Sequence, residues 1–317
     1  MKVTEHIANL TGPKFSFEIL PPTKGSSIQT IYDTLDPLME FKPPYINITY
    51  HQAEVELKQR PDGLIEPRVV RKRPGTVAIS AAIQNRYRID VVPHLICGGF
   101  SKEETEDALI DLHYLGIHNV LIVRGDANPM TGRFLASRNG HEHALTLLKQ
   151  VVDLNNGKYI EEDIENPEPL HFSPGVAAYP EKHIEAPNFE SDLFYLKEKV
   201  DAGAEYVVTQ MFFDNRKYFS FVEACRAAGI RVPIIPGIKP VSIKRHLNIL
   251  PQTFKVDIPT ELSREMDKCN SNAEVRQVGI EWAIHQSKEL INSGVPIIHF
   301  FTMGRADNIR KIAEAIL

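Results

Sequence analysis

The chain has 317 residues, of which 43% are hydrophobic and 24% charged, and its formal net charge is −5 at pH 7. These values are typical of a globular protein. The negative charge excludes a strongly basic surface for nucleic acid, and no apolar run reaches the roughly 18 residues of a membrane-spanning helix. The first residues lack the apolar core of a signal peptide. Three widely spaced cysteines, Cys97, Cys225 and Cys269, favour reduced thiols and therefore a cytoplasmic protein.

Short apolar, β-prone runs recur along the whole chain. Eight of them predict strands, at residues 15–20, 45–50, 91–97, 119–125, 175–180, 206–213, 234–239 and 297–303. Stretches with helical spacing lie between or after them, at 102–115, 189–202, 217–228, 273–292 and 306–317. The first of these helices begins with a capping box formed by Ser101 and Glu104.

This alternation of strands and helices predicts an α/β protein with a parallel sheet. Eight repeats favour closure into a (β/α)8 TIM barrel, with residues 1–317 forming a single catalytic domain. The alternative is an open, doubly wound sheet. Three segments fit no repeat, at 51–74, 127–174 and 251–272. The first two are long loops after strands 2 and 4, on the side where barrel enzymes build their binding sites.

The first predicted strand places a carboxylate inside the barrel. Side chains alternate along a strand, so Phe15, Phe17 and Ile19 share one face, and Ser16 and Glu18 share the other. We expect the apolar face to pack on the helices and Glu18 to point inward near the C-terminal mouth. Burial would raise its pKa and keep it protonated, as a general acid requires. The alternative is a structural glutamate paired with Lys or Arg across the barrel.

The following strands place further polar side chains inward. The second strand contributes Asn47 and Thr49, and the third contributes His94, although a lone strand histidine is more often a hydrogen-bonded core residue than a catalyst. The sixth contributes Gln210, in an otherwise apolar run. Tyr179, at the end of the fifth, offers a flat face with a polar tip.

The fourth strand ends in Arg124-Gly125-Asp126. Gly125 allows a ligand to approach the backbone closely, and Asp126 is expected at the mouth. The alternative for Asp126 is a cap for the next helix.

Several familiar signatures are missing from the sequence. It contains no dinucleotide-binding Gly-x-Gly-x-x-Gly after a strand, no P-loop and no nucleophile elbow. His141-Glu142-His143 has no matching set of ligands, so we expect no metal site. The basic residues at 68–73 are interpreted as a solvated loop, with phosphate binding as the alternative.

Taken in order, short motifs spread over nearly the whole chain identify a family. They are Phe-Glu-x-x-Pro-Pro at 17–22, Thr-Tyr at 49–50, Pro-His-Leu-x-Cys at 93–97, Arg-Gly-Asp at 124–126, Ala-Ala-Tyr-Pro-Glu-x-His at 177–183, Asp-Ala-Gly-Ala at 201–204, Thr-Gln-x-Phe-Phe-Asp at 209–214 and Ile-Pro-Gly-Ile-x-Pro at 235–240. Each motif is weak alone, but the ordered set resembles the flavin-dependent 5,10-methylenetetrahydrofolate reductases, in their short bacterial form without a C-terminal regulatory domain.

The resemblance implies a barrel that holds FAD at the strand mouths. NADH or NADPH reduces the flavin and leaves, and 5,10-methylenetetrahydrofolate then takes its place and is reduced to 5-methyltetrahydrofolate, the methyl source for methionine synthesis. This ping-pong use of one site agrees with the missing dinucleotide fingerprint. The resemblance also implies a homo-oligomer.

Residue roles follow from the motifs that match. The resemblance makes Glu18 the general acid, Asp126 a carboxylate near the flavin and the pterin, and Gln210 a folate contact. Arg305, after the last strand, corresponds to a contact with the folate. The positions that match FAD contacts are Thr49, His94, Arg124, Gly125, Asp126, Tyr179, His183, Asp192 and Lys199. Asp192 and Lys199 lie two turns apart on one predicted helix, so both can face one groove.

The chain departs from the family pattern at three places. The family's glycine-rich turn after strand two is replaced by His51-Gln52-Ala53-Glu54 and a longer basic loop, so the choice between NADH and NADPH is not fixed. His141 stands where a small residue is usual. The last strand continues as Met303-Gly304-Arg305, where the family often has x-Asn-Arg, which leaves the contact from Arg305 less secure. The rival functions are another flavin barrel, such as a proline-dehydrogenase-like oxidoreductase, and a non-catalytic binding barrel.

Overall fold

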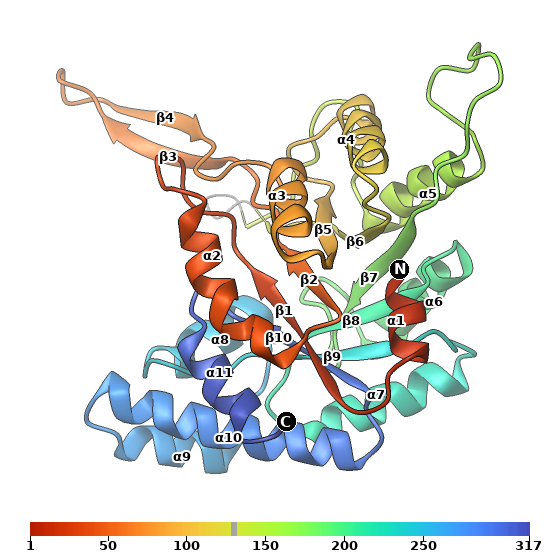
Figure 1. The fold of residues 1–317 in the computed structure, drawn as a ribbon. Helices are drawn as coiled ribbons and strands as arrows, with labels where there is room; N and C mark the ends of the chain where they lie inside the picture. Colours follow the sequence, from red (N-terminus) through yellow and green to blue (C-terminus); the bar gives the residue numbers. More distant parts are fainter. Residues whose placement is uncertain (128–131) are drawn as a thin grey trace.

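The computed structural model describes residues 1–127 and 132–317. Eight parallel strands close into a barrel in the order β1-β10-β9-β8-β7-β6-β5-β2 (Figure 1). They are β1 (Lys14–Ile19), β2 (Tyr45–Ile48), β5 (Asp90–Ile96), β6 (Asn119–Val123), β7 (Ser173–Ala178), β8 (Tyr206–Met211), β9 (Ile234–Ile238) and β10 (Ile297–Phe301). The predicted TIM barrel is therefore confirmed, each predicted strand overlaps one of these, and the open-sheet alternative is excluded.

Helices surround the barrel. They are α1 (Val3–Ala8), α2 (Gln29–Leu35), the 3-10 helix η1 (Asp36–Phe41), α3 (Val77–Tyr87), α4 (Lys102–Tyr114), α5 (Ala144–Asn155), α6 (Phe189–Asp201), α7 (Asn215–Ala227), α8 (His246–Phe254), α9 (Thr260–Lys268), α10 (Asn272–Asn292) and α11 (Asp307–Glu314). Among the described residues, no helix is long and apolar enough to cross a membrane.

The predicted capping box at the start of α4 is present. Ser101 Oγ accepts a hydrogen bond from the Glu104 amide at 3.1 Å, and Glu104 Oε2 accepts one from the Ser101 amide at 2.7 Å. α7 begins two residues earlier than predicted, because the Asp214 side chain accepts a hydrogen bond from the Arg216 amide and caps the helix there.

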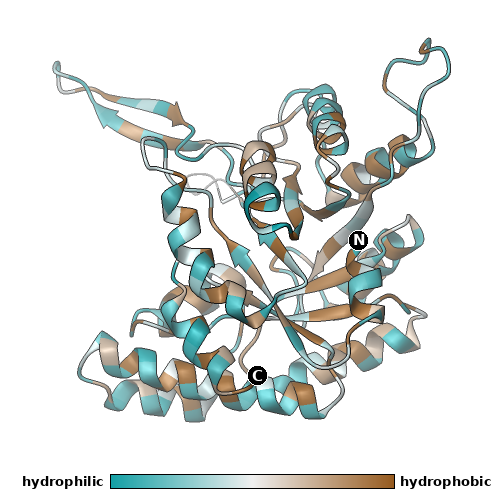
Figure 2. Cartoon of the chain, in the orientation of Figure 1, coloured by the Kyte–Doolittle hydropathy of each residue, from teal (hydrophilic) through white to brown (hydrophobic). Residues whose placement is uncertain are grey.

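Alternation along the strands divides the core into two layers. Phe15, Phe17 and Ile19 belong to the large apolar cluster between the strands and the helices. A smaller cluster fills the barrel interior and includes Tyr45 and Tyr206. The barrel strands are largely brown in Figure 2, whereas the helices around them alternate between brown and teal, as expected for elements with one buried face.

α1 closes the N-terminal end of the barrel. The Val3 amide donates a hydrogen bond to Asn119 Oδ1 at 2.9 Å, and Asn119 is the first residue of β6. The C-terminal ends of the strands, where the long loops emerge, therefore remain available for a site.

All three segments that fitted no repeat contain regular structure that the sequence reading missed. Residues 51–74 include β3 (Glu54–Gln59) and β4 (Ile65–Val70), an antiparallel hairpin that extends away from the barrel (Figure 1). α5 lies within 127–174, and α9 lies within 251–272, which was predicted to be irregular. Charged residues dominate α9, so it lacks the apolar run on which the predictions rest.

Candidate active site

A cavity of about 890 Å³ opens at the C-terminal ends of the barrel strands. Its volume lies in the range usual for small-molecule and cofactor sites, roughly 300–1,000 Å³. It brings together almost all of the side chains singled out from the sequence. Its lining includes Glu18, Thr49, His94, Arg124, Gly125, Asp126, Tyr179, His183, Asp192, Lys199 and Gln210. Arg305 is exposed and is not among the lining residues, so its contact with a substrate stays a prediction.

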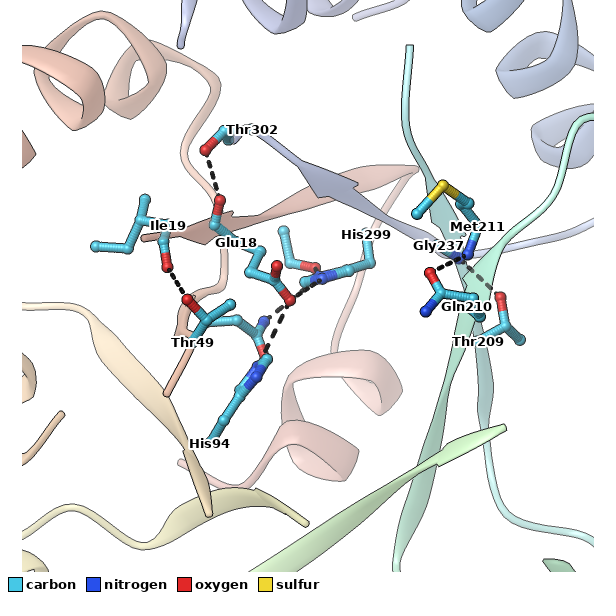
Figure 3. A network of polar contacts seen from close by, with 12 residues as sticks. Glu18, Ile19, Thr49, His94, Thr209, Gln210, Met211, Gly237, His299 and Thr302 are labelled. Atoms are coloured by element: carbon cyan, nitrogen blue, oxygen red, sulfur yellow. Dashed lines mark hydrogen bonds and ion pairs between the residues drawn. The ribbon is translucent and has the colours of Figure 1, made fainter. Parts of the chain in front are cut away.

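Glu18 points into the barrel from β1, as the alternation predicts, and only 12% of its side chain is exposed. Its Oε2 atom lies 3.5 Å from His299 Nε2 and 3.7 Å from His94 Nε2 (Figure 3). Its backbone carbonyl accepts a hydrogen bond from Thr302 Oγ1 at 2.6 Å. The carboxylate therefore has a fixed position beside two imidazoles, with neither Lys nor Arg among the ion pairs found for it in the described residues.

The pKa of Glu18 differs from the expectation. Burial raises this pKa, but the hydrogen bond with His299 and the charges on His94 and His299 outweigh burial and hold it below the usual 4.5. Burial also lowers the pKa of His94 to about 4, so that ring is neutral at pH 7. The hydrogen bond with His299 is therefore the main cause of the lowered pKa of Glu18. The prediction that burial keeps Glu18 protonated is wrong, because the sequence reading did not place His299 beside it.

His299 is the main site residue that the sequence reading missed. It is fully buried on β10, between the outward-facing Ile298 and Phe300. Its Nδ1 atom lies 3.1 Å from Ser16 Oγ and 3.5 Å from Asn47 Nδ2. The alternation that placed Glu18 inward applies equally to this strand and could have identified His299.

The Arg124-Gly125-Asp126 segment forms one rim of the cavity. Arg124 forms an ion pair with Glu185, and Arg124 Nε is buried without a hydrogen-bond partner in the described residues. Gly125 has a φ of +95°, a conformation that favours glycine. Asp126 is exposed at the mouth, and its backbone carbonyl accepts a hydrogen bond from Gln52 Nε2 at 3.0 Å.

A second rim lies between β7 and α6. The rings of Tyr179 and His183 meet edge to face with centroids 4.7 Å apart, and Asp192 Oδ2 accepts a hydrogen bond from the His183 amide at 2.8 Å. Lys199 Nζ donates to the Ala177 carbonyl at 2.9 Å. Burial lowers the pKa of Lys199 to about 8, although Asp192 opposes this effect.

A further wall of the cavity comes from β8, which lies next to β7 in the barrel. Gln210 lies on the cavity side of β8, and its Oε1 atom accepts a hydrogen bond from the Met211 amide at 2.9 Å, which leaves its side-chain NH2 group as a donor (Figure 3). Thr209 Oγ1 accepts from the Gly237 amide at 2.9 Å. A Cβ atom at Gly237 would lie 2.3 Å from the Thr209 carbonyl oxygen, so this close strand contact requires glycine.

These residues suit a ligand that carries phosphates. Arg124, Lys199 and His183 place cationic or hydrogen-bonding groups on one side of the cavity, and the unpartnered Arg124 Nε is a donor without an acceptor. Gly125 gives close access to the backbone beside them. Phosphate oxygens are acceptors that such a set of donors recognises. The residues present therefore fit a flavin dinucleotide.

Comparison with known proteins agrees with this geometry. The family described as methylenetetrahydrofolate reductase matches residues 2–316. The 5,10-methylenetetrahydrofolate reductase of Escherichia coli (strain K12) is 34% identical over 304 residues, which cover 95% of this chain and 90% of that protein. Methylenetetrahydrofolate reductase (NADH) 1 of Arabidopsis thaliana is 31% identical over 330 residues, which cover 100% of this chain and 50% of that protein.

A solved structure shares the fold at much lower identity. It is an uncharacterized protein from Clostridium thermocellum, described as binding two copies of 5-methyl-5,6,7,8-tetrahydrofolic acid. The TM-score is 0.59 at 14% identity, and the match covers 98% of this chain and 96% of that one. This likeness shows the fold alone. The family match over almost the whole length, together with the E. coli relative, shows that this chain belongs to the methylenetetrahydrofolate reductase family.

Proposed function

We propose that this protein, acting as a single catalytic domain, reduces 5,10-methylenetetrahydrofolate to 5-methyltetrahydrofolate with bound FAD and with NADH or NADPH as the reductant. The observation that carries the proposal is that Glu18, Asp126, Gln210 and the matched FAD positions line one cavity in a chain of this family. When bound, FAD accepts a hydride from the reduced nicotinamide and passes it to the folate.

The residues that line the cavity have different proposed roles in proton delivery, electrostatics and binding. We assign the proton delivered to the folate to Glu18, whose largely buried carboxyl group lines the cavity. Asp126, at the rim, supplies a negative charge beside the reacting rings, and the free NH2 group of Gln210 donates to the pterin. Arg124, Tyr179, His183, Asp192 and Lys199 hold the cofactor, together with Thr49, His94 and Gly125.

Spectroscopy of the purified protein tests the proposal against its rivals. We expect a yellow protein whose flavin absorbance is bleached by NADH or NADPH and restored by methylenetetrahydrofolate. Restoration by proline instead would favour a proline-dehydrogenase-like enzyme. A colourless protein that takes up no flavin would favour a non-catalytic binding barrel. Rates with the two nicotinamides, compared directly, establish the preferred reductant.

The β3–β4 hairpin supports an oligomer of this chain. Its pairing places every charged residue of the two strands on one face and the apolar ones on the other. The apolar face consists of Val55, Leu57, Ile65, Pro67 and Val69 with Gln59, and the charged face of Glu54, Glu56, Lys58, Glu66 and Arg68 with Val70. Leu57, Ile65 and Val69 are 58%, 66% and 72% exposed.

We propose that a second copy of the chain covers this apolar face. The face carries no charge, so two copies can meet there without like-charge repulsion, and an isolated two-stranded hairpin is only marginally stable in water. The charged face needs no partner, because Glu54 and Glu56 both pair with Lys72, at 2.7 and 2.9 Å. A closed dimer is the commonest way to bury such a surface.

The cysteines support a reducing compartment, and we propose the cytoplasm. Cys97, Cys225 and Cys269 are all free thiols, and the first two are buried. Disulfides would be expected to form and persist in an oxidising compartment.

A further inference from the structure

A problem at Glu18 follows from its surroundings. A group that protonates the folate must hold a proton at neutral pH. The pKa of Glu18, however, is pushed below its usual value by the hydrogen bond with His299 and nearby positive charge, despite its burial. At neutral pH the isolated carboxyl group would therefore be ionised. A neighbouring group that holds a proton would supply it.

Only two groups form ion pairs with Glu18 in the described part of the chain. They are His299 at 3.5 Å and His94 at 3.7 Å, both through Nε2. His51 and Lys239 also act on Glu18 through their charges, at longer range. Burial lowers the pKa of His94 to about 4, and it also lowers those of His51 and Lys239. His94 is therefore neutral at pH 7 and cannot store the proton.

The far side of the His299 ring can accommodate both protonation states. Its Nδ1 atom faces Ser16 Oγ at 3.1 Å and Asn47 Nδ2 at 3.5 Å. A serine hydroxyl donates or accepts as required, and an asparagine amide can turn to present either its nitrogen or its oxygen. Asn47 Oδ1 is itself buried without a hydrogen-bond partner among the described residues. A turned amide would give this oxygen a partner whenever Nδ1 carries a proton.

We propose that His299 is a positioning residue that stores the proton Glu18 delivers, so that the Glu18–His299 pair acts as the general acid. The inference rests on the proposed function. The proton passes from His299 Nε2 to Glu18 Oε2, and the O–H bond of Glu18 then breaks as an N–H bond forms on the folate. His299 is left neutral and Glu18 ionised. Glu18 borders the cavity, so a proton from solvent that enters between two substrates passes through Glu18 to His299 and restores the starting state.

The variant His299→Gln separates this role from a structural one. Glutamine keeps a hydrogen-bond donor but does not titrate. Two half-reactions are followed by flavin absorbance in stopped flow over a range of pH: reduction by NADH, and reoxidation by methylenetetrahydrofolate. Ser16→Ala is a milder second variant that removes one partner of Nδ1. His118→Gln is the control, because His118 lies just before β6, at the N-terminal end of the barrel and away from Glu18.

We expect His299→Gln to leave reduction by NADH unchanged and to slow reoxidation by folate on the order of 10²-fold. Its folate half-reaction should also lose the pH dependence that we expect for the wild type. A second readout is the ¹³C-carboxyl NMR titration of Glu18, assigned by the loss of its signal in Glu18→Gln. The pKa of Glu18 should rise in His299→Gln, because the charge of His299 that lowers it is lost, and it should rise less in Ser16→Ala, which retains the ring.

An unchanged pH profile and an unchanged Glu18 titration in His299→Gln would overturn the inference. If this variant does not fold, the same two results in Ser16→Ala decide the question. Failure of the proposed function looks different: the wild-type flavin itself would not be reoxidised by methylenetetrahydrofolate. Slower folate reoxidation in the His118→Gln control would show that loss of a histidine outside the site has the same effect, and would also overturn the inference.

Discussion

Gln52 and Asp126 lie 74 residues apart in the chain, and the side-chain amide of Gln52 donates a hydrogen bond to the backbone carbonyl of Asp126 at 3.0 Å. The same side chain rests against Gly98, where a Cβ atom would lie 1.9 Å from Gln52 Oε1. The segment that follows β2 therefore contacts the loops after β5 and β6, the next two strands of the barrel. Replacing Gly98 by alanine would displace it.

The first prediction concerns this connection. Gln52→Ala should leave the barrel intact and loosen the rim that carries Asp126, with a loss of about 0.5–1.5 kcal/mol at most for one hydrogen bond. Hydrogen exchange followed by mass spectrometry should show faster exchange at residues 124–127. Gln59→Ala, an exposed glutamine on β3, is the control. Equal protection in both variants would show that the hydrogen bond does not hold the rim.

Glu18→Gln should separate the two half-reactions. Glutamine preserves the shape of the side chain but carries no transferable proton, so the flavin should bind and be reduced by NADH as in the wild type. Folate turnover should fall by roughly 10²–10⁴-fold, the usual contribution of a positioned acid. Stopped-flow reoxidation by methylenetetrahydrofolate measures this directly. Full folate turnover in this variant would remove Glu18 from the mechanism.

Asp126→Asn should make the flavin easier to reduce. A carboxylate about 4 Å from the negative charge that develops on a reduced flavin costs on the order of 4 kcal/mol at an effective dielectric constant near 20. Removing the charge should raise the flavin midpoint potential and slow hydride transfer to the folate. Equilibrium titration with a reference dye measures the potential. An unchanged potential would argue against an electrostatic role.

The sequence predicted the barrel and much of its mouth because both follow from alternation along strands. It placed Glu18, Asn47 and His94 inward, and all three lie inside the barrel. It did not give the protonation state of Glu18, because that depends on a contact with His299, 281 residues away in the chain. Burial can be inferred from a single strand, whereas the partners that oppose its effect on a pKa come from other strands.

Lys199 provides a prediction that couples stability to pH. Burial lowers the pKa of its amine from 10.5 to about 8, so below pH 8 the folded protein holds a charge that its surroundings disfavour. The free energy of unfolding of the FAD-free protein should therefore rise as the pH increases from about 8 to 10.5, because the folded chain loses the proton first. Denaturant unfolding at several pH values measures this.

The matching variant is Lys199→Met. It should stabilise the FAD-free protein at pH 7 by roughly 1–2 kcal/mol, once the lost hydrogen bond to Ala177 is subtracted, while weakening FAD binding. Lys197→Met, on the same helix but paired with Asp201, should not stabilise the protein. Tighter FAD binding in Lys199→Met would contradict the assignment of Lys199 to the cofactor, since a buried ammonium group is costly unless a ligand compensates it.

The hairpin gives a prediction about assembly, in which its two faces serve as test and control. Leu57→Lys combined with Val69→Lys introduces two like charges on the apolar face, one on each of the two paired strands. We expect the oligomer to dissociate to the 35.8 kDa single chain, with the barrel's melting temperature retained. Light scattering after gel filtration measures the molar mass. Lys58→Ser with Glu66→Ser changes a facing pair on the charged face and should leave the mass unchanged. An oligomer that survives the two lysines would place the contact between copies elsewhere on the barrel.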